Sequence, residues 1–294
     1  LRPSLKAAAG NVLVVNDWSA IEGRGAPWLS ISAEDNFFDQ SAQDKLDRFA
    51  AHDADPTGLD IYQQAADKAG IDNRQVGKVM ELSLQYLGAN GAFNSMARNY
   101  GVFLPDATVS TLVKKWRAAN PWAENFGNKL EAAARQAIRS PRKWFGAGKV
   151  EYIFDPDSMG GTLLCKMPND VYITYPQARL QKMETKWGEK WVITAMKANW
   201  TPSADDKEWP RFALWRGLFV ENVTQAFCAY LLRDSIKRIP DVVLHCHDEL
   251  AVECEENLAA ATADLMRIVM EKGPDGIEGL PLRAEPVIMK RYGK

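Results

Sequence analysis

The segment "VLHCHDELAVE", residues 243–253, constrains the fold more than any other stretch of this 294-residue chain. Apolar residues lead into it, and on the far side apolar residues alternate with charged or small ones, the period of a half-buried strand. His247 and Asp248 lie between these strand-like halves, so the sequence predicts a tight hairpin with both residues at its tip. Asp is common in turns because its carboxylate bonds the local backbone, but Glu249 follows at once. Two adjacent carboxylates repel one another and favour a bound cation.

A further carboxylate follows the short apolar strand "NVLVV", residues 11–15. If this strand pairs beside the hairpin, Asp17 converges with Asp248 and Glu249. Two unit charges about 4 Å apart cost about 4 kcal/mol at an effective dielectric of 20. Hard divalent cations choose carboxylate oxygen, and a pair of Mg²⁺ ions is the standard arrangement for in-line phosphoryl transfer. In the alternative interpretation, the S-x-x-E sequence at 19–22 is a capping box that opens a helix, and Asp17 merely precedes it.

A predicted helix over "NRQVGKVMELSLQYLG" carries two cations on one face, Arg74 and Lys78, spaced i, i+4. Such a like-charge pair is mildly destabilising by itself, by about 0.2–0.5 kcal/mol. An anion such as a triphosphate would more than offset that cost. Tyr86 lies two turns further on nearly the same face, where it could stack on a base or belong to the core. The alternative for the cations is a solvated face on which Lys78 pairs with Glu81.

The order of elements along the chain is strand, helical block, strands, helix, hairpin, helix. This order predicts an α+β fold in which a helical subdomain is inserted into a sheet-based one. Residues 34–58 are expected to be acidic and loop-like, and residues 182–216 a hairpin excursion rich in Trp and charge. A long amphipathic helix is expected from about Leu218 to Ile239.

Composition excludes some classes of protein. The net charge of −2 does not indicate a nucleic-acid partner for the chain as a whole, although basic residues cluster locally beside aromatic ones. The four cysteines form no C-x-x-C pair and are typical of reduced intracellular thiols. The most apolar long run contains charged and amide side chains, so we expect no membrane span and no signal peptide.

Three of these segments together resemble the family A, or DNA polymerase I-like, DNA polymerases. "VVNDWSAIEGR" resembles motif A, "RQVGKVMELSLQYLG" resembles motif B, and "HDEL" resembles motif C, in the family's order and at similar separations. "DIY", "GAF" and the E-N-x-x-Q set are similar to the shorter phage and prophage branch. The resemblance implies a right-hand fold with an antiparallel palm sheet and inserted helical fingers. Its expected parts are palm at 1–50, fingers at 51–148 and palm again at 149–294, with no thumb or exonuclease domain in this chain.

The resemblance implies roles for the acidic residues. Asp17 and Asp248 would hold two Mg²⁺ ions, with the backbone carbonyl of Trp18 as a further ligand. Glu249 would assist beside them, and His247 would contact the primer end.

The same resemblance assigns nucleotide contacts to the other motifs. Arg74 and Lys78 would hold the triphosphate, with Lys78 also acting as an acid toward pyrophosphate. Glu22 would block a ribose 2′-OH, and Tyr86 would lie by the templating base. A phosphate-binding His of the bacterial enzymes is replaced here by Tyr62.

Primer–template contacts are expected from the long helix and from motif A. Gln225 would contact the duplex near the primer terminus, Asn222 shares its helix face, and Arg24 completes the primer–template set. One departure is Leu82, which stands where motif B usually has Phe or Tyr.

The implied activity is that of a DNA-directed DNA polymerase acting on primer–template DNA and dNTPs in the cytoplasm of a bacterial or phage-infected cell. The alternative is a non-catalytic or split polymerase module that binds nucleic acid and needs a separate chain, or a missing N-terminal segment, carrying the thumb and exonuclease. A metal-dependent nuclease would explain the carboxylates but not the Arg74/Lys78 helix.

Overall fold

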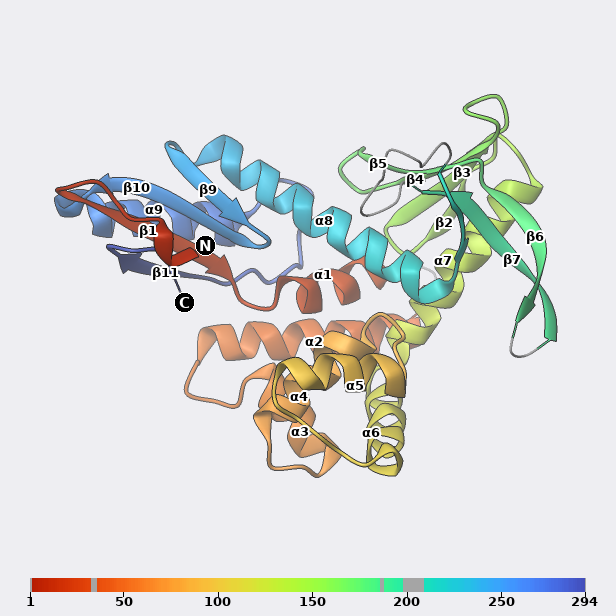
Figure 1. The fold of residues 1–294 in the computed structure, drawn as a ribbon, viewed down its shortest axis with the longest axis horizontal. Coiled ribbons are helices and arrows are strands. Elements are labelled where there is room, and N and C mark those ends of the chain that lie inside the picture. The colour runs from red at the N-terminus through yellow and green to blue at the C-terminus, as the bar shows by residue number, and fades with distance from the viewer. Residues whose placement is uncertain (1, 33–35, 186–187, 198–208, 294) are drawn as a thin grey trace.

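The computed structural model describes residues 2–32, 36–185, 188–197 and 209–293. Within them the chain forms the mixed helix and sheet arrangement shown in Figure 1. The helices are α1 (Ile21–Ser30), α2 (Asn36–Ala54), α3 (Ile61–Ala69), α4 (Arg74–Leu84), α5 (Asn90–Asn99), α6 (Asp106–Ala119), α7 (Pro121–Arg139), α8 (Arg216–Arg238) and α9 (Ala259–Lys272). The strands are β1 (Asn11–Trp18), β2 (Phe145–Ala147), β3 (Val150–Asp155), β4 (Thr162–Lys166), β5 (Tyr172–Pro176), β6 (Arg179–Thr185), β7 (Gly188–Met196), β8 (Arg211–Leu214), β9 (Val242–Cys246), β10 (Glu249–Glu255) and β11 (Ala284–Met289). The predicted α+β class is confirmed.

The first sheet joins the two ends of the chain in the order β11-β1-β10-β9. β1 runs antiparallel to β10, with Asp17 opposite Glu249, so the predicted pairing of the N-terminal strand with the hairpin is confirmed. Alternate residues of β1 pack toward α9, and the indole of Trp18 donates from Nε1 to the Met270 carbonyl at 3.1 Å. This sheet fixes the end of β1 beside the turn between β9 and β10.

Two smaller sheets follow the helical block in sequence. One has the order β2-β3-β4-β5, and the other, β6-β7-β8, contains the predicted hairpin excursion as far as the described residues show it. They pack around α7 and the start of α8, on the right of Figure 1. The long helix α8 therefore runs from these sheets to the first one.

The helices α2–α7 form their own apolar core, which includes Val79, Met80 and Phe93. Two helix starts are fixed by side-chain caps: Asp60 caps α3, and Asn73 caps α4 by accepting from the backbone of the first turn. No helix in the described ranges is long and apolar enough to cross a membrane.

Two expectations are wrong. Residues 36–54, expected to be loop-like, form α2, because Ala42, Leu46 and Phe49 share one buried face at helical spacing despite the acidic residues between them. The capping box is also absent: α1 begins after Ala20, which is left-handed with φ 51°, and no side chain caps the helix.

Candidate active site

The turn between β9 and β10 places Asp248 beside Asp17. It is a two-residue turn, and His247 at its first position has a positive φ of 56°, a conformation that His adopts more readily than most residues. The Trp18 amide donates to the Asp248 carbonyl at 3.2 Å, which ties the turn to the end of β1. Burial, and next the charge of Asp17, raise the pKa of Asp248 to about 6. Asp17 and Asp248, called the acidic pair below, thus interact directly.

Glu249 behaves differently from the acidic pair. Its carboxylate is buried and accepts a hydrogen bond from the hydroxyl of Tyr292, near the C-terminal end of the described chain. Among the residues that the structure describes, no three or more His, Cys, Asp or Glu side chains are grouped so that they could hold a metal ion. The structure therefore supports a site of two carboxylates where the sequence predicted three.

The acidic pair fits magnesium. Mg²⁺ is usually held by one or two carboxylates together with water and substrate phosphates, so two carboxylates are enough. Burial, and next the charge of Asp17, raise the pKa of Asp248, and a bound cation would offset both effects. Because the Trp18 indole is buried in the core, Trp18 could serve as a ligand only through its backbone carbonyl.

The cations of α4 lie against aromatic rings. The Arg74 guanidinium is 2.5 Å from Oδ2 of Asp60, and its centre lies 5.1 Å from the ring of Tyr62. The Lys78 Nζ lies 5.8 Å from the ring of Tyr62 and 5.0 Å from that of Tyr100. Burial is the main cause that raises the pKa of Tyr62 to about 12, so its hydroxyl stays protonated at neutral pH.

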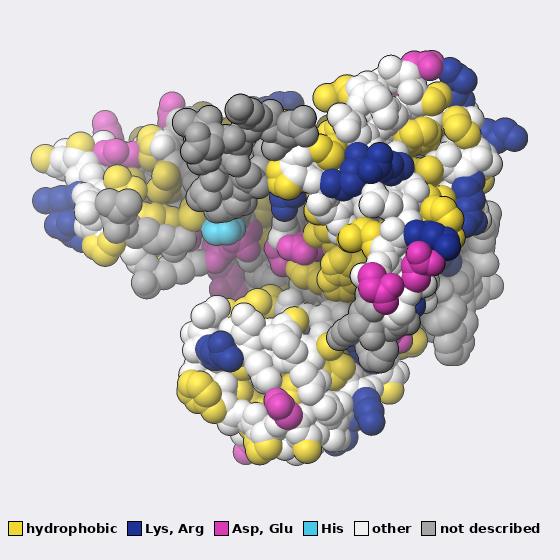
Figure 2. All heavy atoms as spheres, turned by 45° about the vertical axis from the view of Figure 1, so that its right-hand side comes forward, with side chains coloured by type: hydrophobic (Ala, Val, Ile, Leu, Met, Phe, Trp, Pro, Cys, Tyr) yellow, Lys and Arg dark blue, Asp and Glu magenta, His cyan; other side chains and the backbone are white. Residues whose placement is uncertain are grey.

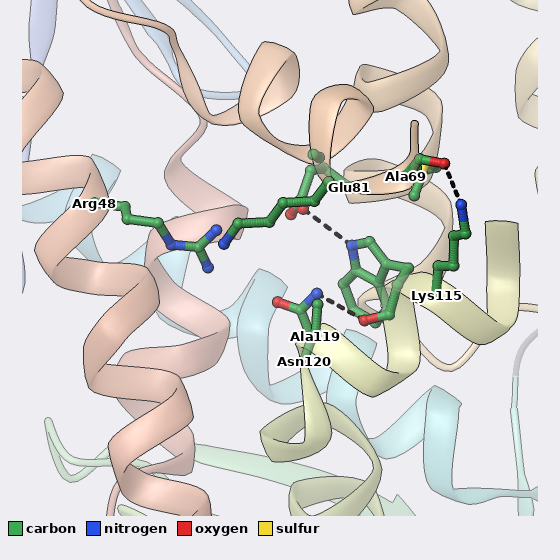
Figure 3. A pocket seen from close by; sticks show the side chains of 10 residues that line it. Arg48, Ala69, Glu81, Lys115, Ala119 and Asn120 are labelled. Atoms are coloured by element: carbon green, nitrogen blue, oxygen red, sulfur yellow. Dashed lines mark hydrogen bonds between the residues drawn. The ribbon is translucent and has the colours of Figure 1, made fainter. Parts of the chain in front are cut away.

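The alternative pairing of Lys78 with Glu81 is wrong. The carboxylate of Glu81 instead binds Nζ of Lys45 at 2.5 Å. It also accepts a hydrogen bond from Nε1 of Trp116 at 3.0 Å, which Figure 3 shows. In the described part of the chain, no carboxylate lies within ion-pair distance of Lys78. Its charge is therefore available to an anion.

Tyr86 links motif B to motif A. Its hydroxyl donates to Oε2 of Glu22 at 2.7 Å, and burial, followed by the charge of Glu22, raises its pKa. Sequence analysis singled out both residues but not their contact, which joins segments 64 positions apart. Glu22 is thereby fixed in one orientation close to Asp248, whose pKa it also raises.

One face of α8 lies close to Glu22. Burial, and then the charge of Glu22, raise the pKa of Glu221. Burial, and then the charges of Glu22 and Asp248, raise the pKa of the Cys228 thiol. Sequence analysis did not single out Glu221 or Cys228. The signal was their spacing of seven, which puts them on one helix face with Gln225 between them.

The predicted duplex contacts on α8 differ in their surroundings. Gln225 is exposed, as a DNA contact requires. Asn222 is half-buried and donates from Nδ2 to the hydroxyl of Tyr175 at 3.1 Å. Only Gln225 is open to a ligand in this conformation.

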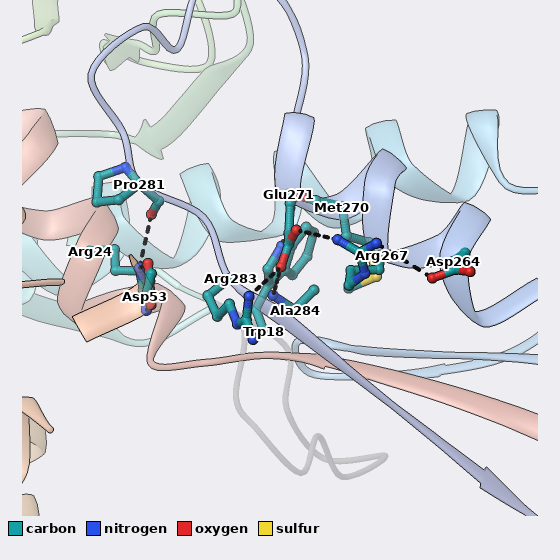
Figure 4. Close-up of polar contacts among 10 residues, drawn as sticks. All are labelled: Trp18, Arg24, Asp53, Asp264, Arg267, Met270, Glu271, Pro281, Arg283 and Ala284. Carbon is teal, nitrogen blue, oxygen red and sulfur yellow. Dashed lines mark hydrogen bonds and ion pairs between the residues drawn. The ribbon is translucent and has the colours of Figure 1, made fainter. Parts of the chain in front are cut away.

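The prediction that Arg24 contacts primer or template is wrong. Its guanidinium is 1% exposed and forms two hydrogen bonds to the carboxylate of Asp53, at 2.5 and 2.8 Å. It also donates to the carbonyl of Pro281 (Figure 4). It donates to the carbonyl of Ser19 as well and lies over the ring of Phe49. Arg24 therefore fastens α1 to α2 and to the segment before β11.

Figure 2 shows the molecule hollowed between its helical lobe and the rest, with acidic side chains and a histidine on the wall of the hollow. The acidic pair comes from the first sheet, and the α4 cations come from the helical lobe. The two charge types thus belong to different parts of the chain.

Comparison with known proteins agrees with this arrangement. No family model matches the chain. A DNA polymerase of Bacillus phage SP02 is 25% identical over 303 aligned residues, which cover all of this chain and 43% of that protein.

A solved structure described as the POL domain of Pol1 from M. smegmatis, in complex with DNA primer-template and dNTP, matches with a TM-score of 0.55 and 13% identity. The match covers 99% of this chain and 41% of that one, so this chain spans less than half the length of either protein. The chain is thus similar over its whole length to a phage DNA polymerase and has the fold of a polymerase domain, which confirms the resemblance to DNA polymerases that its three motifs predict.

Proposed function

We propose that this chain is the catalytic region of a template-directed DNA polymerase of family A, which adds dNTPs to a primer 3′-OH with the help of two Mg²⁺ ions. In the reaction, the primer 3′-oxygen attacks the α-phosphorus of the dNTP and pyrophosphate leaves. Primer–template DNA and dNTPs are its partners, and the cytoplasm of a bacterial or phage-infected cell is its setting.

Asp17 and Asp248 would hold the metal ions, with the Trp18 carbonyl as a further ligand. When bound, the ions neutralise phosphate charge and lower the pKa of the primer hydroxyl. The turn fixes Asp248, and the amide of Trp18 holds that turn in place, so the protein's part is positioning. Glu249, bound to Tyr292, would support the turn from behind, and His247 would face the primer end.

Arg74 and Lys78 would bind the triphosphate from α4. A guanidinium binds phosphate through two parallel hydrogen bonds, so Arg74 would exchange its partner Asp60 for the ligand. Lys78, which lies over Tyr62 and Tyr100, would donate a proton to pyrophosphate. The rings of Tyr62 and Tyr100 would stabilise both cations in position while the triphosphate is absent.

Glu22 would exclude a ribose 2′-OH, and the hydroxyl of Tyr86 would keep its carboxylate in the orientation that does so. Tyr86 itself would lie beside the templating base. Gln225 would contact the duplex, and Asn222 would join it only after leaving Tyr175.

The observation that carries this proposal is the direct interaction of Asp17 with Asp248, where burial, and next the charge of Asp17, raise the pKa of Asp248 to about 6. A pair of repelling carboxylates at the end of a buried strand is costly unless a cation binds there.

Primer extension with Mg²⁺ and four dNTPs tests the proposal. Wild-type protein should extend the primer and Asp248→Asn should not. Asp241→Asn is the matched control, because Asp241 is an exposed residue at the opposite end of the same hairpin. If both variants extend equally, the site assignment is wrong.

Absence of extension by wild type leads to a second assay. Magnesium-dependent dNTP binding that Lys78→Ala weakens would favour the alternative, an assembled site that needs another segment or chain for activity. Absence of both activities would refute the polymerase function for this chain.

A further inference from the structure

An exposed tryptophan lies at the start of α8, next to the backbone of Tyr86. Trp215 is the residue before the first turn of α8 and is 48% exposed. A Cβ built on Gly217 would lie 2.2 Å from ring atoms of Trp215 and 2.3 Å from the Tyr86 carbonyl oxygen. The ring and this carbonyl thus occupy the same small space, so Trp215 and Tyr86 are neighbours.

Two arginines flank this tryptophan. Arg117 donates to the carbonyl of Gly88 at 3.1 Å, and Arg216 donates to the side chain of Asn128 at 2.8 Å. Both guanidiniums also approach Glu124, but only at 3.8 and 3.9 Å. One carboxylate at the outer limit of an ion pair thus faces two cations, and the side chains of both arginines are about one-third exposed.

Tyr86 connects this surface to the acidic pair. Its backbone lies beside Trp215, while its hydroxyl lies 2.7 Å from Glu22, which in turn acts on Asp248. The surface made of Trp215, Arg216 and Arg117 therefore lies on the far side of Tyr86 from the acidic pair.

We propose that Trp215 stacks on the first unpaired template base beyond the templating position, and that Arg216 and Arg117 bind the phosphates next to it. This inference rests on the proposed function, in which Tyr86 lies beside the templating base. An exposed aromatic ring between cations suits single-stranded nucleic acid, because every base has a π face and every linkage an anionic phosphate. Stacking on Trp215 therefore requires no particular base at that template position.

Equilibrium binding to primer–templates that differ only in the template overhang tests the proposal. The primer ends in a dideoxynucleotide so that it cannot be extended, and the template has either a four-nucleotide overhang or a blunt end. Trp215→Ala should weaken binding to the overhang DNA about five- to a hundredfold, the usual effect of losing one stacked base. Binding to the blunt DNA should stay within about twofold, since no stacked base is lost there.

Two variants control for structure. Trp215→Phe keeps an aromatic face and should retain most of the affinity. Trp191→Ala removes an exposed tryptophan from β7, where it lies opposite Lys182 of β6, and should bind both DNAs like wild type. Far-ultraviolet circular dichroism checks that each variant is folded.

Two further readouts distinguish stacking and phosphate contact from general loss of structure. The fluorescence of 2-aminopurine at the first overhang base should be quenched by wild type and Trp215→Phe but not by Trp215→Ala. Arg216→Gln should reduce the slope of log affinity against log salt by about 0.7, the value for one phosphate contact on a single strand.

The inference would be overturned if Trp215→Ala bound both DNAs as tightly as wild type does, or if it lost the same affinity for blunt and for overhang DNA. Either result would leave the proposed function standing. If wild type binds neither DNA, the proposed function is wrong and this inference falls with it.

Discussion

Replacing Glu81 by leucine should destabilise the protein by about 3–5 kcal/mol, because it leaves a buried lysine without its counter-charge. Lys45 is fully buried, and its Nζ lies 2.5 Å from the Glu81 carboxylate. The same carboxylate accepts the indole N–H of Trp116 (Figure 3). Glu81 thus joins α4, which carries Arg74 and Lys78, to both α2 and α6.

A double variant separates the ion pair from the rest of the loss. Lys45→Met together with Glu81→Leu removes both charges and leaves only the N–H of Trp116 without a partner, at a cost of about 1–3 kcal/mol. The double variant should therefore be more stable than Glu81→Leu alone. Urea unfolding followed by circular dichroism measures both free energies, provided that the m-values agree. A double variant no more stable than the single one would refute the reasoning.

The pH dependence of the single variant provides an independent check. Burial lowers the pKa of Lys45 from 10.5, and Glu81 partly offsets this effect. Without Glu81 the pKa falls further, so the folded state binds fewer protons than the unfolded state up to pH 10.5. Stability rises with pH wherever the unfolded state binds more protons, so the deficit of Glu81→Leu should shrink as pH rises toward 10.5. The double variant, which lacks the lysine, should show no such recovery.

Three further outcomes are expected. Gly77→Ala should cost about 1–3 kcal/mol or more in urea unfolding, because its Cβ would lie 1.9 Å from a backbone oxygen of α3, whereas Gly91→Ala, with open space around it, should not be destabilised by steric overlap. In EDTA, stability should fall as pH rises through about 6, because the raised pKa of Asp248 contributes stability below its ordinary value of 3.8 that is lost on ionisation. Added Mg²⁺ should abolish that fall and Asp17→Asn should reduce it; a fall that Asp17→Asn leaves unchanged would contradict the pairing. Arg24→Leu should lose about 3–5 kcal/mol by leaving the half-buried carboxylate of Asp53 without its partner, while the folded variant keeps its DNA affinity in filter binding. A selective loss of DNA affinity would restore the rejected contact.

The hairpin and its partner strand could be predicted because the signals are local and strong. Period-2 alternation and a two-residue turn leave only one register that buries the apolar face, so the position of Asp248 at the tip follows from the sequence alone. The start of α4 is equally local, since Asn73 caps its own helix. These elements carry the acidic pair and the α4 cations.

What could not be predicted depends on contacts between distant segments. The buried arginine Arg24 reads as a surface residue until α2 brings Asp53 to it. Glu249 is predicted to assist beside the metal ligands, but the hydroxyl of Tyr292, 43 residues later, binds its carboxylate. α2 itself was missed because its acidic residues hid the spacing of a buried face. A sequence pattern gives residue types and spacing, whereas partner choice is set by the tertiary fold.

The opposite charges of the two parts explain why one ligand would suit both. Asp17, Asp248 and Glu22 raise local negative charge near the end of β1, enough to raise the pKa of Asp248. On α4, Lys78 faces only aromatic rings within the described structure, and Arg74 binds one half-buried carboxylate, that of Asp60. An anion alone would satisfy the cations but worsen the acidic side, and a divalent cation alone would do the reverse. A metal-bound triphosphate carries both charges in one body, so it stabilises both parts at once and would draw α4 toward the acidic pair.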